Sequence, residues 1–171
     1  CDTDRGRAEA AAAASSCGQA YVSLEAMLAA GGLDAVSLCT PSGLHPEHGI
    51  MAARRGVNVI SEKPLGVRLS DIDKLIKTCD ENGVKLFCVK QNRLNSTMRL
   101  LKAAVEKGRF GRIYMAQVNV FWQRPQSYYD SAKWRGTWEM AGGAYLNQPS
   151  HYVDSLSWLL RDVESDSAVT G

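Results

Sequence analysis

The chain has 171 residues, of which 45% are hydrophobic and 22% are charged, and its formal net charge at pH 7 is +2. This apolar content excludes a disordered or low-complexity chain, and the length is enough for one globular domain or one and a half. Positive and negative residues are nearly balanced, and the basic residues form no cluster, so we expect no nucleic-acid partner. No apolar run reaches the roughly 18 residues that a membrane-spanning helix needs, so we expect no membrane partner either.

The five cysteines are scattered along the chain and form no CxxC pair. This spacing is typical of small apolar residues in a reducing compartment, and not of a disulfide framework or a zinc site. We therefore expect a cytoplasmic protein without a bound metal. The chain begins with Cys1 in place of Met, and residues 167–171 resemble the start of another strand, so we also expect a fragment of a longer polypeptide.

The first half of the chain alternates between helical and strand-like segments. Helical patterns at 5–17 and 23–31 come first. Three short apolar runs bounded by turn residues then follow, as expected of buried strands, at 34–39, 57–61 and 84–89. Single helical segments, 46–55 and 70–82, separate these runs, which implies parallel pairing with right-handed crossovers. The pattern predicts an α/β fold with a doubly wound parallel sheet, and we assign it to a first domain at 1–93.

The pattern changes after residue 93. A helical segment at 95–106 is followed by a long alternating stretch at 113–122, which indicates a half-exposed strand of an open, mostly antiparallel sheet. An aromatic-rich loop at 123–139 and a helix at about 148–160 complete the chain. We therefore predict the start of an α+β domain at 94–171.

Polar residues follow each of the three predicted strands, at 40–45, 62–64 and 91–93. Ligands of open α/β sheets bind at the carboxyl ends of the strands, so we expect these clusters to lie on one rim. Two alternatives remain open at this point. The first cluster is equally consistent with a plain connection, and Glu62 with Lys63 is consistent with a solvated ion pair.

Asn147 and His151 are four residues apart, a spacing that puts them on one face of a helix. Pro149 is tolerated only in a first turn, so we expect the helix to begin near Asn147, which would be its N-cap. The positive end of the helix favours the neutral, proton-accepting form of His151. A histidine that is hydrogen-bonded for structure alone explains the position equally well.

Taken together, three segments resemble the Gfo/Idh/MocA oxidoreductase family, and the resemblance covers essentially the whole chain. The segments are the strand and turn at 34–45, the Ser-Glu-Lys-Pro-Leu motif at 61–65, and the Gly-Gly to Asp stretch at 142–154. Four further segments and Asn147 are similar to those of UDP-N-acetylglucosaminuronate 3-dehydrogenases, which act in bacterial surface-polysaccharide biosynthesis. These segments are 90–95, 108–114, 119–125 and 134–138.

The resemblance implies a partial Rossmann domain that binds NAD, followed by part of a substrate-binding and oligomerisation domain. Asp2 would bind the adenosine ribose hydroxyls, which favours NAD, but Arg5 and Arg7 leave NADP open and Asp2 is also consistent with a turn or cap residue. The Gly-rich turn that holds the pyrophosphate in this family would precede Asp2. The cofactor-binding residues implied are Asp2, Thr40, Pro41, Ser42, Leu44, His45, Glu62, Lys63, Gln91, Trp134 and Arg135.

The activity that the resemblance implies is the oxidation of a sugar hydroxyl, at C3 of a nucleotide sugar. His151 is the expected base, Lys63 would polarise the reacting oxygen, and Asn147 would position the substrate or His151. We also expect a homo-oligomer, a dimer or tetramer. Two alternatives are a dehydrogenase of another sugar or an inositol, and a non-catalytic binding protein. The presence of both Lys63 and His151 argues against the second.

Overall fold

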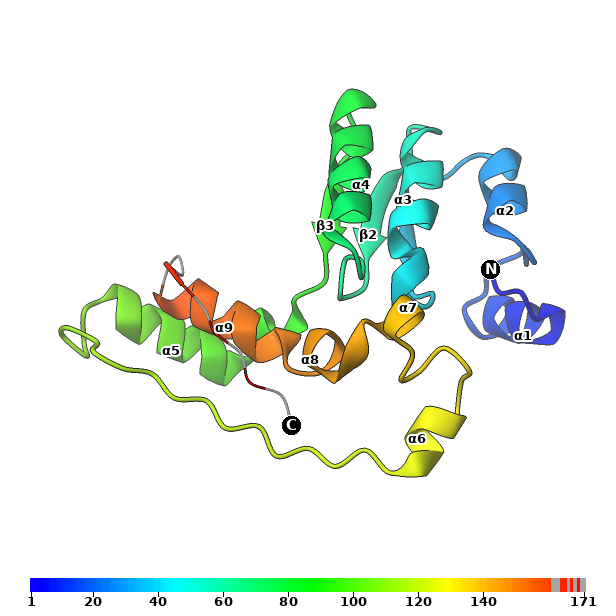
Figure 1. Ribbon diagram of the computed structural model, residues 1–171. Coiled ribbons are helices and arrows are strands. Elements are labelled where there is room, and N and C mark those ends of the chain that lie inside the picture. The colour runs from blue at the N-terminus through cyan, green and yellow to red at the C-terminus, as the bar shows by residue number, and fades with distance from the viewer. Residues whose placement is uncertain (161–163, 166, 168, 170–171) are drawn as a thin grey trace. The chain divides into compact units, whose positions relative to one another are not determined.

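The structure, a computed structural model, describes residues 1–160, 164, 165, 167 and 169 (Figure 1). The chain divides into two compact units, at 1–88 and 89–171. None of the helices in the described part of the chain is long and apolar enough to cross a membrane.

The first unit is built on a three-stranded parallel sheet, as the alternation of segments predicts. Its strands are β1 (Ala35–Leu38), β2 (Asn58–Ser61) and β3 (Leu86–Cys88), in the spatial order β1-β2-β3. The helices of this unit are α1 (Arg5–Ala14), α2 (Leu24–Ala30), the short 3-10 turn η1 (Ser42–Leu44), α3 (His45–Ala53) and α4 (Leu69–Glu81).

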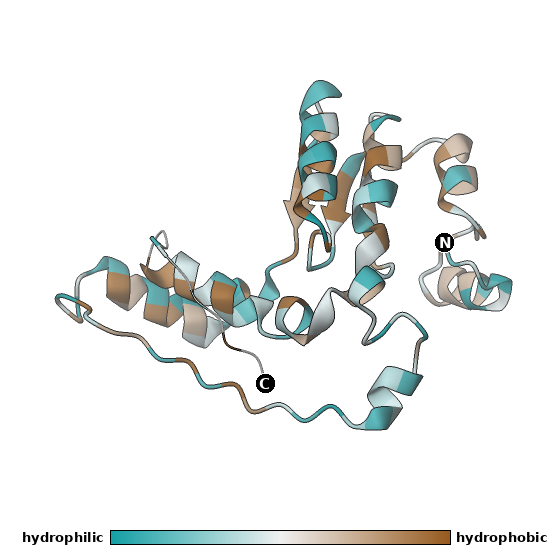
Figure 2. Ribbon diagram, viewed as in Figure 1, coloured by the Kyte–Doolittle hydropathy of each residue, from teal (hydrophilic) through white to brown (hydrophobic). Residues whose placement is uncertain are grey.

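The core of the first unit lies between one face of the sheet and two helices. Val36 pairs with Val59, and Val59 pairs with Leu86, so these side chains share a face. This face is covered by α3 and α4, and Leu75 of α4 is fully buried there. Figure 2 shows the hydrophobic residues of the strands beneath these helices.

The opposite face of the sheet is open in the described residues. Ile60 and Phe87, which are register partners, are 37% and 53% exposed there. Within the described residues, only one of the two helix layers of the doubly wound sheet that we predicted is therefore formed on these strands. The physical reason is the strand order, because both right-handed crossovers step in the same direction and so place α3 and α4 on the same face.

The second unit is helical in its described residues. Its elements are the 3-10 turn η2 (Gln91–Leu94), α5 (Ser96–Glu106), α6 (Gln126–Asp130), α7 (Trp138–Ala141), α8 (Gly143–Asn147) and α9 (Ser150–Leu160).

The strand that we predicted at 113–122 is not formed. The segment between α5 and α6 runs as a long stretch without regular structure (Figure 1), and hydrophobic and hydrophilic residues alternate along it (Figure 2). Tyr114 and Phe121 are 83% and 91% exposed. A strand needs a neighbour to pair its backbone groups, and the described residues of this unit supply none.

Candidate active site

The turns that follow β1 and β2 are joined by a buried histidine. His45 is 1% exposed; its Nδ1 lies 2.8 Å from the carbonyl oxygen of Pro64, and its Nε2 lies 2.8 Å from that of Thr40. Carbonyl oxygens only accept, so a ring N–H of His45 is the donor in such a contact. The structure thus brings two of the three predicted polar clusters together, and it uses His45, an expected cofactor contact, to brace them.

The Glu62–Lys63–Pro64 cluster begins where β2 ends. The backbone N–H of Glu62 donates to the carbonyl of Leu38, and the Glu62 carboxylate accepts a hydrogen bond of 3.1 Å from the backbone N–H of Lys63. Lys63 is partly buried, and the peptide bond between Lys63 and Pro64 is cis. These contacts hold Glu62 and Lys63 at the carboxyl end of the sheet, beside the end of β1.

A second histidine, His48, supports the same turn. Its Nδ1 lies 3.1 Å from Oγ1 of Thr40, and the side chain is half-buried on α3. Burial lowers the pKa of His48, and Glu47 opposes this shift. The ring is therefore biased toward its neutral form, which offers one nitrogen as an acceptor to the Thr40 hydroxyl.

The structure places Asp2 in an ion pair with Arg7. The Oδ1 atom of Asp2 accepts hydrogen bonds from Nη2 of Arg7 at 2.9 Å and from the backbone N–H of Asp4 at 2.8 Å. The hydrogen bond from Arg7 lowers the pKa of Asp2, and the bond from Asp4 adds to this effect. Asp4, whose side chain accepts from the Arg7 N–H, is the N-cap of α1. Asp2 is thus ionised at neutral pH and lies just before the start of α1.

The helix that we predicted at about 148–160 is formed as α9, but Asn147 and His151 lie on two successive helices and so do not share one helix face. Asn147 is the last residue of α8, and α9 begins at Ser150, after Pro149. The backbone N–H groups of Tyr152 and Val153 donate to the carbonyl of Pro149 and close the first turn of α9. His151 therefore lies in the first turn of a helix, as expected, but Asn147 is not its N-cap. His151 is 7% exposed.

The aromatic loop and α8 enclose a cavity of about 230 Å³ in the second unit. Six of its lining residues are Tyr128, Trp134, Arg135, Trp138, Asn147 and Gln148. The structure thus brings Trp134 and Arg135 together with Asn147. Gly142 and Gly143, with φ angles of 71° and 78°, allow the sharp connection from α7 to α8 that forms one side of the cavity.

Two arginines pack against the aromatic rings of this loop. The Arg135 guanidinium lies 4.4 Å from the ring of Tyr128 and 5.1 Å from that of Trp134. Arg124 lies 4.9 Å from the Trp122 ring and donates to Gln148, which in turn donates to the hydroxyl of Tyr128. The Nε atoms of both arginines are buried without a hydrogen-bond partner. Stacked guanidinium groups of this kind are well suited to binding an anionic group.

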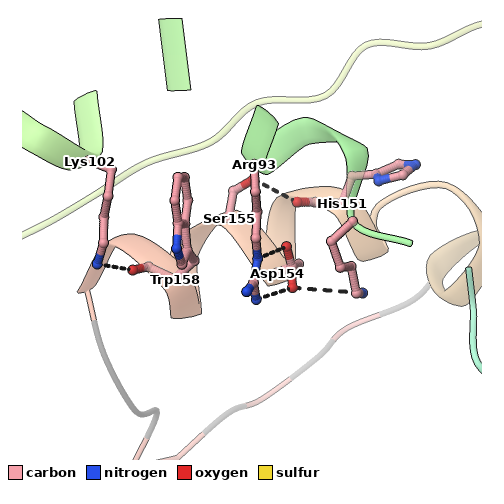
Figure 3. Close-up of polar contacts among 7 residues, drawn as sticks. Arg93, Lys102, His151, Asp154, Ser155 and Trp158 are labelled. Carbon is pink, nitrogen blue, oxygen red and sulfur yellow. Dashed lines mark hydrogen bonds and ion pairs between the residues drawn. The ribbon is translucent and has the colours of Figure 1, made fainter. Parts of the chain in front are cut away.

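Sequence reasoning missed a further polar cluster beside His151. Arg93 of η2 donates two hydrogen bonds to Asp154 of α9, at 2.9 and 2.7 Å (Figure 3). Both residues lie within motifs that the sequence singled out, but nothing in their 61-residue separation indicates that they pair. Across the described residues, no group of three or more His, Cys, Asp or Glu side chains is arranged to hold a metal ion.

Family comparison agrees with both halves of the chain. Residues 1–90 match the oxidoreductase family with an NAD-binding Rossmann fold, and residues 98–171 match the Gfo/Idh/MocA C-terminal domain. The chain belongs to the Gfo/Idh/MocA family. The resemblance predicted from the sequence motifs is thereby confirmed, as is the Rossmann-type parallel sheet.

Two solved structures of this family are especially similar to the chain. The WlbA dehydrogenase from Bordetella pertussis, in complex with NADH and UDP-GlcNAcA, is 56% identical with a TM-score of 0.89. The WlbA dehydrogenase from Chromobacterium violaceum, in complex with the same two ligands, is 51% identical with a TM-score of 0.89. Each comparison covers 94% of this chain and 46% of the other.

Curated relatives within the family have diverse functions. The 2,7-anhydro-N-acetylneuraminate hydratase of Mediterraneibacter gnavus is 29% identical over 81% of this chain and 36% of its own length. The 1,5-anhydro-D-fructose reductase of Ensifer adhaerens is 30% identical over 94% of this chain and 47% of its own length. The chain thus spans between about a third and a half of the relatives that it matches.

Proposed function

We propose that the protein containing this chain is an NAD-dependent dehydrogenase that oxidises the C3 hydroxyl of UDP-N-acetylglucosaminuronate. The observation that carries this proposal is the 56% identity, over 94% of the chain, to a WlbA dehydrogenase solved with NADH and UDP-GlcNAcA. The inositol dehydrogenases among the relatives are more distant, as illustrated by the Thermotoga maritima enzyme at 30% identity.

Three side chains carry the proposed chemistry. His151 accepts the proton of the C3 hydroxyl as the hydride leaves C3, which converts the alcohol to a ketone. Lys63 donates to the same oxygen and stabilises the negative charge that develops on it. Asn147 cannot take a proton, so it positions the substrate by hydrogen bonding. Its place on the wall of the cavity beside Arg135 supports this role.

The residues present are consistent with a dinucleotide. NAD, when bound, supplies the hydride acceptor. The ionised carboxylate of Asp2 suits a pair of ribose hydroxyls, and its negative charge disfavours a 2′-phosphate, although Arg7 beside it keeps NADP as an alternative. Thr40, Pro41, Ser42, Leu44 and His45 form or brace the turn after β1, and Glu62 and Lys63 form the turn after β2. Gln91, Trp134 and Arg135 complete the proposed set.

The same proposal includes the strand at 113–122, the association of subunits and the location in the cell. Residues 113–122 form a strand of an open antiparallel sheet when a neighbouring strand is available, and their alternating hydrophobicity supports this (Figure 2). The domain at 94–171 then serves substrate binding and subunit association, so the protein is a homo-oligomer. A nucleotide-sugar substrate and a nicotinamide cofactor support a location in the cytoplasm.

The test is a turnover assay with the expressed protein that contains this chain. UDP-N-acetylglucosaminuronate and NAD are mixed with it, and the absorbance of reduced nicotinamide is followed, with 2-oxoglutarate added to recycle tightly bound NADH. We expect turnover that falls by at least about 100-fold in Lys63→Ala and His151→Asn, the scale at which a general base acts. Lys77→Ala, which removes an exposed lysine of α4 that pairs with Glu81, is the control.

The outcomes separate the alternatives. Turnover of an inositol or a free sugar, with none of the nucleotide sugar, would reassign the substrate and keep the enzyme class. Saturable binding of the nucleotide sugar without any oxidation would favour a non-catalytic binding protein. Full turnover by His151→Asn would remove the proposed base.

A further inference from the structure

Helix α9 has an unusually polar buried side. His151 and Ser155 are each 7% exposed, and the side chain of Asp154 is 9% exposed. Together with Trp158, these residues follow the spacing of three, four and seven that places side chains on the same side of a helix. Burying a carboxylate costs free energy unless the charge is paired, so the contacts of Asp154 decide how this helix is held.

Asp154 is held by a two-pronged contact with Arg93. The Nε atom of Arg93 donates to Oδ2 at 2.9 Å, and Nη2 donates to Oδ1 at 2.7 Å (Figure 3). Lys90 adds a second positive charge 3.8 Å from Oδ1. Two parallel bonds between planar groups fix the orientation of the partners as well as their separation.

The far end of α9 has a different attachment. Lys102 of α5 donates to the backbone carbonyl of Trp158 at 2.6 Å, and its ammonium lies 5.6 Å from the Trp158 ring. This contact holds the last turns of the helix to α5. The Arg93–Asp154 pair acts nearer the start of the helix, since Asp154 lies three residues after His151.

We propose that Arg93 and Asp154 are positioning residues that orient His151. The pair fixes the rotation and the axial register of α9, and thereby the direction in which the imidazole leaves the helix. In Figure 3 the imidazole points away from the Asp154 carboxylate, so the pair acts through the helix backbone. The proposal rests on the proposed role of His151 as the base.

The alternative is that the pair contributes only to stability. A bidentate ion pair fixes the orientation of its two partners, and so it restricts small rotations and translations of the helix that carries one of them. A displacement of about 1 Å at a catalytic group costs on the order of 100-fold in rate. A pair that orients His151 must therefore affect turnover more than it affects substrate binding.

The first experiment compares Arg93→Lys and Asp154→Asn with the wild-type protein in the turnover assay. Arg93→Lys keeps the positive charge but removes the guanidinium that donates two hydrogen bonds to Asp154. Asp154→Asn keeps the shape of the side chain but removes its negative charge. We expect kcat to fall about 10- to 100-fold in both variants while KM for the nucleotide sugar changes less than about 3-fold. Lys102→Gln, which loosens the other end of α9, is the matched control and should keep kcat within about 2-fold.

The second experiment does not depend on the substrate. Diethyl pyrocarbonate modifies exposed imidazoles, and the rate at which it modifies His151 is followed by mass spectrometry of the peptide that contains it. We expect this rate to rise several-fold in Arg93→Lys and Asp154→Asn, at a temperature where circular dichroism shows each variant folded, and to be unchanged in Lys102→Gln. If Asp154→Asn fails to fold, Arg93→Lys carries the test.

The outcomes are distinct. Variants that melt earlier but keep kcat and the modification rate of His151 would reduce the pair to a structural role and overturn the proposal. Equal rises in KM and falls in kcat/KM, with kcat unchanged, would also overturn it. Absence of turnover by the wild-type protein would contradict the proposed function, and the modification rates would still decide whether the pair orients His151.

Discussion

Residues at the strand ends have structural roles that the sequence motifs do not reveal, and His45 is the clearest case. The sequence motif places it among cofactor-binding residues, but its ring is buried between the carbonyls of Thr40 and Pro64. The sequence of the turn after β1 does not indicate that His45 contacts the turn after β2, because α3 separates the two turns along the chain. The sequence therefore predicts which residue types lie at the rim. It does not predict which of them brace the turns and which are left to contact a cofactor.

Replacing His45 tests this bracing role. His45→Leu removes both ring contacts and leaves the buried carbonyl of Pro64 without this partner, so we expect a loss of about 1–3 kcal/mol in the free energy of unfolding. His45→Gln retains one donor and should lose less. Chemical denaturation measures both, and the KM for NAD should rise in step if the turns after β1 and β2 hold the cofactor. Equal stability of His45→Leu and the wild type would contradict the bracing role.

His48 predicts a pH dependence of stability. Burial lowers its pKa in the folded state below the usual value of 6.5, so the unfolded chain binds the proton more readily. The free energy of unfolding therefore rises with pH through this window; the contribution is fully present above about pH 6.5 and is lost as the pH falls through the lower folded pKa.

The measurement is the melting temperature of the wild type and of His48→Gln at about pH 7.5 and about pH 5. Glutamine keeps a polar partner for Thr40 and does not titrate in this range. The drop in melting temperature on acidification should be smaller in the variant. An identical drop in both proteins would assign the acid sensitivity to other groups.

At the scale of elements, local patterns succeed where an element finds its partners nearby. The apolar runs at 34–39, 57–61 and 84–89 contain the three observed strands because each pairs with the next run along the chain. The alternation at 113–122 is equally regular, but it finds no neighbour in the described residues. Alternating hydrophobicity indicates which face of a strand is apolar. It does not indicate whether a second strand is available to pair with it.

The break between α8 and α9 shows the same limit at smaller scale. The spacing of Asn147 and His151 fits one helix, with Pro149 in its first turn. The structure instead ends α8 at Asn147 and starts α9 at Ser150. The residue Pro149 was a correct boundary signal, but a short helix before it was not visible, because five residues are too few to show a 3.6-residue period.

The packing of α3 on α4 depends on one glycine. A Cβ atom at Gly49 would lie 2.6 Å from Cδ1 of Leu75, which is fully buried, so one of the two side chains must shift. We expect Gly49→Ala to destabilise the protein by about 1–3 kcal/mol, because overpacking outweighs the gain of up to about 1 kcal/mol in helix propensity. Gly18→Ala, where a Cβ atom meets no atom within 4 Å, is the control for denaturation. An unchanged midpoint in Gly49→Ala would show that the two helices can separate without cost.

At the scale of the molecule, the parallel sheet of the first unit has two unlike faces. One is closed by α3 and α4, with Val59 at 0% exposure. The other carries the register partners Ile60 and Phe87 in contact with water. Both crossovers step in the same direction, so no helix between these strands can reach the open face. Exposed apolar side chains on a sheet are a source of self-association.

Because the two faces differ, we expect similar substitutions on them to affect the stability of the 171-residue chain differently. Ile60→Thr with Phe87→Thr removes apolar area that is already partly in water, so we expect less light scattering at a given concentration and little change in the denaturation midpoint. Val59→Thr places a hydroxyl in the closed core and should cost about 1–3 kcal/mol. If the double variant instead lost as much stability as Val59→Thr, both faces of the sheet would be covered in solution, and the open face would be an interface between copies of the chain.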